Sequence, residues 1–101
     1  MKRGTTVTHV FNTTEDMTRS KIYVTYSQKG RVVLEKTNNN IVIEAGKITV
    51  PLSQEDTLNM LADVPTEIQI RLVREDGTAI ASNIVHAKVS KILKGGVISY
   101  G

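Results

Sequence analysis

Cysteine is absent from this chain of 101 residues, and aromatic residues are scarce. Without cysteine there is no disulfide bond, no thiolate metal site and no cysteine nucleophile, as is common in proteins of a reducing compartment. Only one phenylalanine and three tyrosines are available. The hydrophobic core must therefore be built mainly from isoleucine, valine and leucine.

The chain also has no long hydrophobic run. No stretch approaches the roughly 20 consecutive apolar residues that a membrane-spanning helix needs. Met1–Gly4 is basic, as the start of a signal peptide would be, but polar residues rather than an apolar stretch follow it. We therefore expect a protein that is made inside the cell and has no membrane partner.

The charge of the chain is modest and unevenly distributed. The formal net charge is +3 at neutral pH. Lys88, Lys91 and Lys94 lie near the end, whereas Ser53–Glu67 contains acidic residues and no lysine or arginine. A mild positive charge permits weak attraction to nucleic acid, but an ordinary solvated surface is the simpler explanation. Opposed charged regions also suit association with further copies of the chain or with other proteins.

The segment Thr66–Leu93 gives the clearest indication of the fold. Hydrophobic and polar residues alternate before the turn Glu75–Gly77, and they alternate again after it, where Val85, Ala87 and Val89 fall on one face. Alternation with a period of two on both sides of a short turn predicts an antiparallel hairpin with one buried face.

The hairpin has an irregularity in its second half. Ile80 and Val85 lie in opposite phase, so the hydrophobic set changes face near Ser82 and Asn83. A regular strand cannot change face without an extra residue or a break. We therefore predict a bulge or kink at this point, or a strand that leaves one sheet for another.

The same alternation predicts further strands along the chain. They are expected at Thr5–Phe11, Lys21–Gln28, Arg31–Thr37, Ile41–Glu44 and Lys47–Leu52. Turns are expected at Lys29-Gly30, at Asn38–Asn40 and at Gly46, because glycine and asparagine tolerate positive φ. Proline lacks an N–H group, so the last of these strands should end at Pro51 or lie at a sheet edge there.

One short helix is expected after Leu52. Ser53 can cap its start, and the acidic residues Glu55 and Asp56 suit the positive end of a helix. Leu58 and Leu61 are spaced to share a helical face. We predict one or two turns that cover one end of the core.

Together these elements predict an all-β fold, an immunoglobulin-like antiparallel β-sandwich of about seven strands with one short helix. A small barrel and a jelly-roll fragment are the alternatives. Residues 1–94 should form a single domain. Gly95-Gly96 is a hinge that leads into a C-terminal tail, residues 95–101.

We find no pattern that indicates catalysis or metal binding. His9 and His86 are the only histidines, they fall in different strands, and no spacing gives either a nucleophile or carboxylate partner. Glu55 and Asp56 are adjacent, so on a helix they point apart, and compensation of the helix dipole explains them. We expect no enzyme activity, no cofactor and no metal ion.

Two sets of residues are candidates for interaction. In the tail, Val97, Ile98 and Tyr100 are apolar enough to dock on the same sheet or on a neighbour. Lys21 and Tyr23 share the outer face of a strand, which faintly matches the basic and aromatic surfaces that bind single-stranded nucleic acid. An ordinary solvent-exposed strand face is the favoured explanation of this second pair.

Several segments resemble a family of proteins. Met1–Asn12, Tyr26–Lys36, Leu52–Thr57 and the pattern from Ile68 to Ile98 resemble short proteins encoded in phages and prophages of Firmicutes, associated with the tail or baseplate. The layout is also similar to the β-sandwich N-terminal domain of upper baseplate proteins from lactococcal-type phages, whose receptor-binding or collagen-like extensions have no counterpart in these residues. The shared motifs are structural, so the resemblance implies a virion component of the tail region and no catalytic residue.

Our leading hypothesis is therefore a phage or prophage virion structural or accessory protein that acts through protein–protein assembly. It would self-associate or bind other virion proteins, and it would be found in the virion or, during assembly, in the cytoplasm of the host bacterium. The alternative is a small nucleic-acid-binding β domain. A host-interaction protein, such as an inhibitor of defence enzymes, is a third hypothesis on which the sequence is silent.

Overall fold

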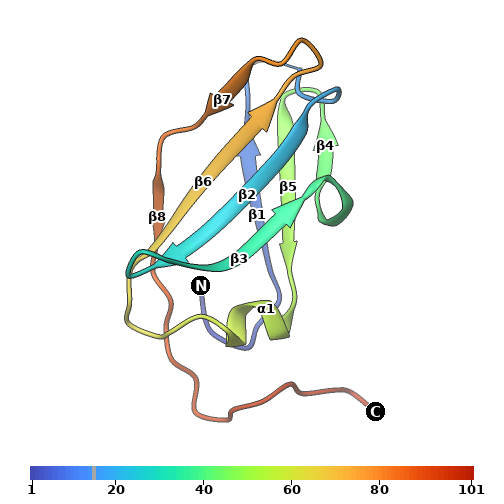
Figure 1. Ribbon diagram of the computed structural model, residues 1–101. Coiled ribbons are helices and arrows are strands. Elements are labelled where there is room, and N and C mark those ends of the chain that lie inside the picture. Colours follow the sequence, from blue (N-terminus) through green and yellow to red (C-terminus); the bar gives the residue numbers. More distant parts are fainter. Residues whose placement is uncertain (15) are drawn as a thin grey trace.

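The chain folds into two antiparallel sheets that face each other (Figure 1). The computed structural model describes residues 1–14 and 16–101; Glu15, inside the predicted domain, lies outside the described residues. Eight strands, one short α-helix and one 3-10 turn are present in the described part of the chain. The prediction of an all-β sandwich with one short helix is confirmed.

The smaller sheet has three strands in the order β1-β5-β4. They are β1 (Val7–Asn12), β5 (Lys47–Leu52) and β4 (Val42–Glu44). The strand β5 lies in the middle and has the predicted bounds, Lys47–Leu52, so of the two predicted alternatives for Pro51, a strand end or a sheet edge, the first does not apply. However, β4 pairs with β5 only as far as Thr49. Pro51 therefore lies beyond the last paired residue on that side, where a missing N–H costs no ladder hydrogen bond.

The larger sheet is built around two long central strands. Its order is β3-β2-β6-β7, and β8 also pairs with β6. The strands are listed here in chain order: β2 (Lys21–Gln28), β3 (Arg31–Thr37), β6 (Thr66–Val73), β7 (Ala79–Ala81) and β8 (Val85–Ala87). A two-residue turn joins β2 to β3, with Lys29 and Gly30 both at positive φ. This turn type matches the natural twist of the strands that it connects.

The strand order is that of an immunoglobulin-type sandwich. In that fold, strands A, B, E and D form one sheet and strands C, F and G the other, with C′ added in some members. The order β1-β5-β4 corresponds to B-E-D, and β3-β2-β6 followed by β7 and β8 corresponds to C′-C-F-G. Among the described residues no strand takes the place of A, beside β1. Near the N-terminus, only an isolated parallel bridge joins Lys2 to Ser90.

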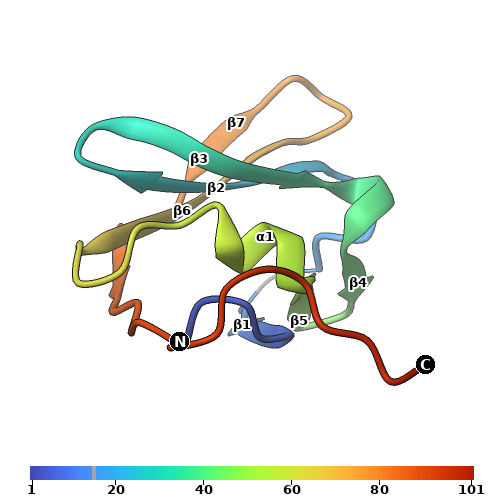
Figure 2. The same ribbon diagram turned by 90° about the horizontal axis from the view of Figure 1, so that it is seen from below.

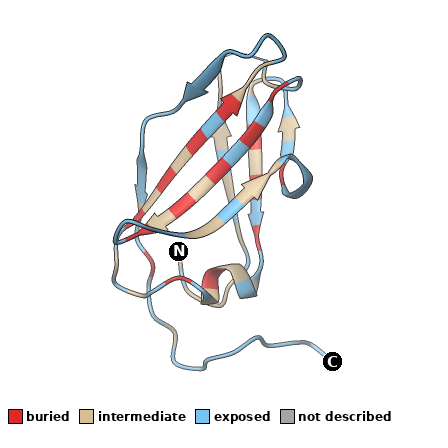
Figure 3. Ribbon diagram, in the orientation of Figure 1, coloured by how far each residue is buried: buried red, intermediate tan, exposed pale blue. Residues whose placement is uncertain are grey.

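The core lies between the sheets and is aliphatic, as predicted. Buried and exposed residues alternate along β2 and β6 (Figure 3), which is the pattern of strands with one face in the core. The fully buried side chains include Ile22, Val24, Ile48 and Val50. Tyr26 is the one aromatic residue in the buried core of the described chain.

The helix α1 (Gln54–Leu58) covers one end of the core. Ser53 and Asp56 form a capping box, in which the Ser53 hydroxyl accepts from the Asp56 N–H and the Asp56 carboxylate accepts from the Ser53 N–H. The predicted helix start is therefore correct. The shared face of Leu58 and Leu61 is not, because the helix ends at Leu58, Leu61 is exposed and Met60 fills the core instead.

The predicted irregularity near Ser82 and Asn83 is confirmed as a break between β7 and β8. Both short strands pair with β6, so the chain stays in one sheet. The prediction that Val85 is buried is wrong, because its side chain is 49% exposed, whereas Val89 is buried as expected. Hydrophobic side chains of this segment are therefore fully buried again only at Val89, after β8 has ended.

The end of the sandwich near α1 is closed by polar side chains. The buried amide of Gln28 donates to the Leu61 carbonyl and to the Thr66 hydroxyl, and it accepts from the Leu61 N–H. The Arg3 guanidinium donates to the carbonyls of Leu58 and Met60, where the helix ends. These bonds satisfy backbone groups that would otherwise be left without partners.

Candidate assembly interface

The two long sides of the sandwich differ. On the closed flank, the 3-10 turn η1 (Asn38–Asn40) crosses from β3 in one sheet to β4 in the other. The Asn38 side chain accepts a hydrogen bond from the Ile22 N–H and donates one to the Ser20 carbonyl, at 2.6 and 2.8 Å. Ile41, which follows the turn, is buried. The chain itself therefore seals this flank.

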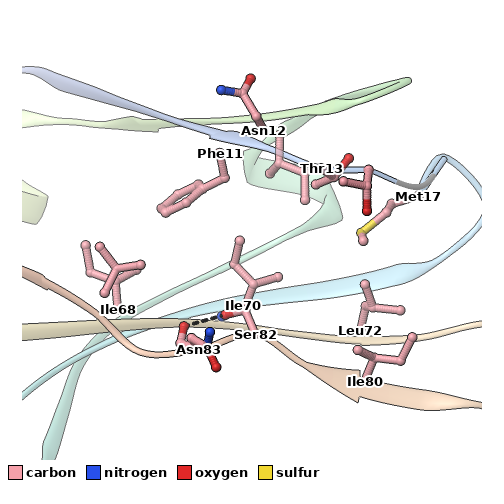
Figure 4. A pocket seen from close by; sticks show the side chains of 13 residues that line it. Phe11, Asn12, Thr13, Met17, Ile68, Ile70, Leu72, Ile80, Ser82 and Asn83 are labelled. Carbon is pink, nitrogen blue, oxygen red and sulfur yellow. Dashed lines mark hydrogen bonds between the residues drawn. The ribbon is translucent and has the colours of Figure 1, made fainter.

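On the open flank, between β1 and the β7–β8 edge, there is an apolar groove of about 390 Å³. Figure 4 shows Phe11 and Met17 reaching down from the layer of β1 toward Ile70 and Leu72 of β6. None of the described residues that line the groove is charged. They are Phe11, Asn12, Thr13, Thr14, Met17, Ile48, Ile68, Ile70, Leu72, Ile80, Ser82, Asn83 and Val85.

The groove exists because the edge strand is broken. Ser82 turns the chain between β7 and β8: its N–H donates to the Ile70 carbonyl, and its hydroxyl accepts from the Ile70 N–H and donates to the Asn83 carbonyl. The Gln69 side chain donates to the Ser82 carbonyl from the same strand. With the chain held in this way, Ile80 and Val85 lie at the mouth of the groove, partly exposed.

The upper border of the groove is an unprotected strand edge. Within the described residues β5 is the sole strand partner of β1. The sequence of β1 contains no lysine, arginine, aspartate, glutamate or proline. Such residues normally discourage edge strands from pairing with other chains, and the edge strand β3 does carry them, at Arg31, Glu35 and Lys36. The edge of β1 can therefore accept another strand.

The tail predicted from Gly95-Gly96 onward is mostly exposed and does not enter the core of its own domain. Val97 and Ile98 are each 56% exposed, and Tyr100 is fully exposed. One clip holds the tail: the Gln54 side chain donates to the Ile98 carbonyl and accepts from the Ile98 N–H, at 2.9 and 2.8 Å. Figures 1 and 2 show the tail passing near α1 toward the side of β4, away from β8.

Lys21 and Tyr23 lie together on the outer face of β2, as the sequence predicts, with both residues exposed. Tyr23 pairs across the sheet with Arg71 of β6, so two cations lie close to one exposed ring. Further along the same face, Thr25 donates to Glu35. The face is therefore mixed in charge rather than a continuous basic strip.

The two histidines lie apart and in different surroundings. His9, on β1, shares a hydrogen bond of 2.7 Å with the Tyr26 hydroxyl, and the two rings stack. Burial raises the pKa of Tyr26 far above its ordinary value, and burial together with the N-terminal charge lowers the pKa of His9. His86 is exposed on β8. In the described part of the chain no group of acidic, histidine or cysteine side chains is arranged to hold a metal ion.

Sequence reasoning found the tail and the Lys21–Tyr23 face but missed the groove. The structure places those two candidates in different regions, because the tail leaves near α1 whereas Lys21 begins β2 at the opposite end. A signal for the groove was present in the opposite phases of Ile80 and Val85. That signal predicted a break in the strand. It did not predict that β1, in the opposite sheet, would lack a neighbouring strand on the same flank.

Comparisons with known proteins give no relative. A scan against protein-family models, a search of curated proteins and a search of solved structures each found no match. Of the helices in the described residues, none has the length and apolar character to cross a membrane.

Proposed function

We propose that this chain is a phage or prophage virion structural or accessory protein of the tail or baseplate region, which acts by protein–protein assembly. The observation that carries the proposal is the apolar groove on the open flank, which has an uncharged lining among the described residues and is bordered by the unprotected edge of β1. Contiguous exposed apolar surface of this kind marks interaction sites in soluble proteins. The resemblance of the sequence to tail-associated phage proteins supports the virion as the place of assembly.

The test has two parts. Size-exclusion chromatography with light scattering should show an oligomer whose proportion rises with protein concentration. Mass spectrometry of virions purified from a host that carries the gene should find the protein, at a level that persists after high-salt washing. A strict monomer at the highest concentration, together with absence from the virions, would contradict the proposal.

A second candidate function, nucleic-acid binding, rests on Tyr23 and the neighbouring Lys21 and Arg71. Aromatic stacking with flanking cations is how many β domains hold single strands. A salt titration of binding to single-stranded DNA tests this candidate, with Tyr23→Ser as the variant and Tyr100→Ser as a matched tyrosine control. Binding that weakens with salt and is lost only in Tyr23→Ser would support it, and absence of binding at low salt would exclude it.

A further inference from the structure

We propose that the groove on the open flank, together with the edge of β1, receives the C-terminal tail of a second copy of this chain. The inserted tail would lie beside β1, where an immunoglobulin-type sandwich has its strand A. This inference rests on the proposed function, because it names the partner and the surfaces of the assembly. Addition of an extended segment to a free sheet edge is an established mode of recognition.

The tail and the groove match in chemistry. Residues 95–101 carry no charged side chain, and the lining residues that the structure describes are also uncharged. In an extended chain, alternate residues share a face, so Ile98 and Tyr100 point to one side and Val97 and Ser99 to the other. Ile98 and Tyr100 would enter the groove among Phe11, Ile80 and the isoleucines of β6, while the tail backbone would pair with β1.

The side-chain area that the two tails can bury reaches the lower end of the size range of specific dimer interfaces. Burial of Tyr100 removes about 150–250 Å² from water, and burial of an aliphatic side chain such as Ile98 roughly 60–120 Å². In a reciprocal exchange, the two side chains of each tail and an equal area of each groove amount to about 800–1,500 Å², which overlaps the lower part of the range of specific protein–protein interfaces. Each copy carries both the tail and the groove, so two copies that exchange tails reciprocally would form a closed two-fold dimer.

The chain is anchored up to a defined point and released beyond it. Ser90 is bonded to the N-terminal segment through the Met1 carbonyl and the Arg3 N–H. Ile92 packs over Gly4, where an added Cβ would lie 2.8 Å from the Ile92 side chain. Beyond Ile92, Leu93 is almost fully exposed, and the clip from Gln54 to Ile98 holds the tail to the domain. The eight residues from Leu93 to Tyr100 span up to about 26–29 Å when extended, enough to reach a neighbour.

The clip implies two positions for the tail. In one, Ile98 is held by Gln54 on its own domain; in the other, the tail is released and inserted into the neighbour. Two exposed hydrogen bonds favour the first position, which competes with insertion into the neighbour. Gln54→Ala removes these bonds and should therefore favour the dimer. We expect this variant to lower the dimer dissociation constant about fivefold. A weaker dimer in Gln54→Ala would overturn the proposed exchange.

Substitutions in the tail test the insertion itself. Tyr100→Ser should raise the dimer dissociation constant, measured by light scattering or analytical ultracentrifugation, at least about tenfold. The matched control Ser99→Ala changes the opposite face of the tail and should stay within about twofold. Equal dissociation constants for the native chain and Tyr100→Ser would overturn the inference.

Cross-linking identifies the two surfaces. Because the chain contains no cysteine, only the introduced cysteines can form disulfides. Variants with one cysteine in the tail, Ile98→Cys or Tyr100→Cys, are mixed with variants that have one in the groove, Ile80→Cys or Val85→Cys. At least one pair should form a mixed disulfide under mild oxidation, because disulfides need Cα atoms within about 7 Å. Val42→Cys, on the outer face of the other sheet, is the exposed control and should not react with the tail.

The outcomes separate this inference from the function on which it rests. Oligomers that need Tyr100 and that cross-link tail to groove between copies support both. Oligomers that form equally well in Tyr100→Ser and cross-link at other surfaces overturn the tail exchange, but they still support the proposed function in assembly. A tail cysteine that forms no mixed disulfide with either groove cysteine also overturns the exchange. A monomer at every concentration, with no virion protein bound, overturns both.

Discussion

The closed and open flanks of the sandwich differ in whether the chain crosses from one sheet to the other. On the closed flank the chain crosses between the sheets. There Asn38 hydrogen-bonds to the backbone of Ser20 and Ile22, and Ile41 is buried between the sheets. On the open flank the chain turns at Ser82 and stays in one sheet, so a groove remains beside the edge of β1 that has no strand partner among the described residues. The comparison shows that a chain connection between the two sheets covers the core on that flank. On a flank without such a connection, an added strand is needed to cover the core.

The largest expected effect concerns the core of the closed flank. Ile41→Ala should lower the free energy of unfolding by about 2–4 kcal/mol, because it opens a cavity between the sheets. The neighbouring Val42 is exposed, so Val42→Ala should change it by less than about 0.5 kcal/mol. Urea denaturation of the two variants checks the contrast. Similar losses in both variants would mean that the closed flank is not sealed at Ile41.

The next effect concerns the hydrogen bonds on the same flank. Asn38→Ala leaves the Ile22 N–H and the Ser20 carbonyl without their partner, and we expect a loss of about 1–3 kcal/mol. Asn39→Ala is the matched control in the same turn and should be close to neutral. Thermal denaturation of the pair provides the measurement, and an equal melting temperature for both variants would contradict the role of Asn38.

On the open flank we expect the reverse pattern. Ile80 is partly exposed at the mouth of the groove, so Ile80→Ser should cost less than about 1 kcal/mol in the unfolding of the monomer. The same variant should weaken self-association, which light scattering measures at several concentrations. A large loss of monomer stability with unchanged association would show that the open flank is ordinary core, and the contrast between the flanks would fail.

The smallest effect is a dependence of stability on pH, located at β1. Because burial lowers the pKa of His9 in the folded protein, protons bind the unfolded chain more readily in the range below the ordinary value of about 6.5. Stability should therefore be complete above that value and decrease as the pH falls below it toward the pKa of folded His9.

Urea midpoints at pH 7.5 and pH 5.5 check this dependence, with His9→Gln as the control variant. The native chain should be less stable at the lower pH, and the variant should show a smaller difference. A native chain that is equally or more stable at pH 5.5 would contradict the assigned environment of His9.

The sequence was sufficient to predict most strands and the helix start, because local patterns determine them. Lys21–Gln28 and Arg31–Thr37 are strands with the predicted bounds, and the turn at Gly30 follows from a residue that tolerates positive φ. Ser53 caps the helix as its position before the acidic residues implied. The phase change between Ile80 and Val85 also predicted the break in the edge strand.

The remaining features depend on which strands are neighbours, and a local pattern does not contain that information. The alternation around Val85 looks like a buried face, yet β8 is at an edge and Val85 is exposed at the groove. Met60 rather than Leu61 enters the core, because the helix ends after Leu58 and the spacing of a continuing helix no longer applies. The groove itself arises from β1 and β6, which are more than fifty residues apart in the chain.

The most direct test of the central claim is an isotope-filtered NMR experiment on the full chain. A mixture of labelled and unlabelled copies gives nuclear Overhauser effects that arise only between molecules. We predict such effects between the side chains of Ile98 and Tyr100 in one copy and those of Phe11, Ile80 and Val85 in the other. Intermolecular effects that lack the tail, or tail effects confined to the same molecule near Gln54, would contradict the account.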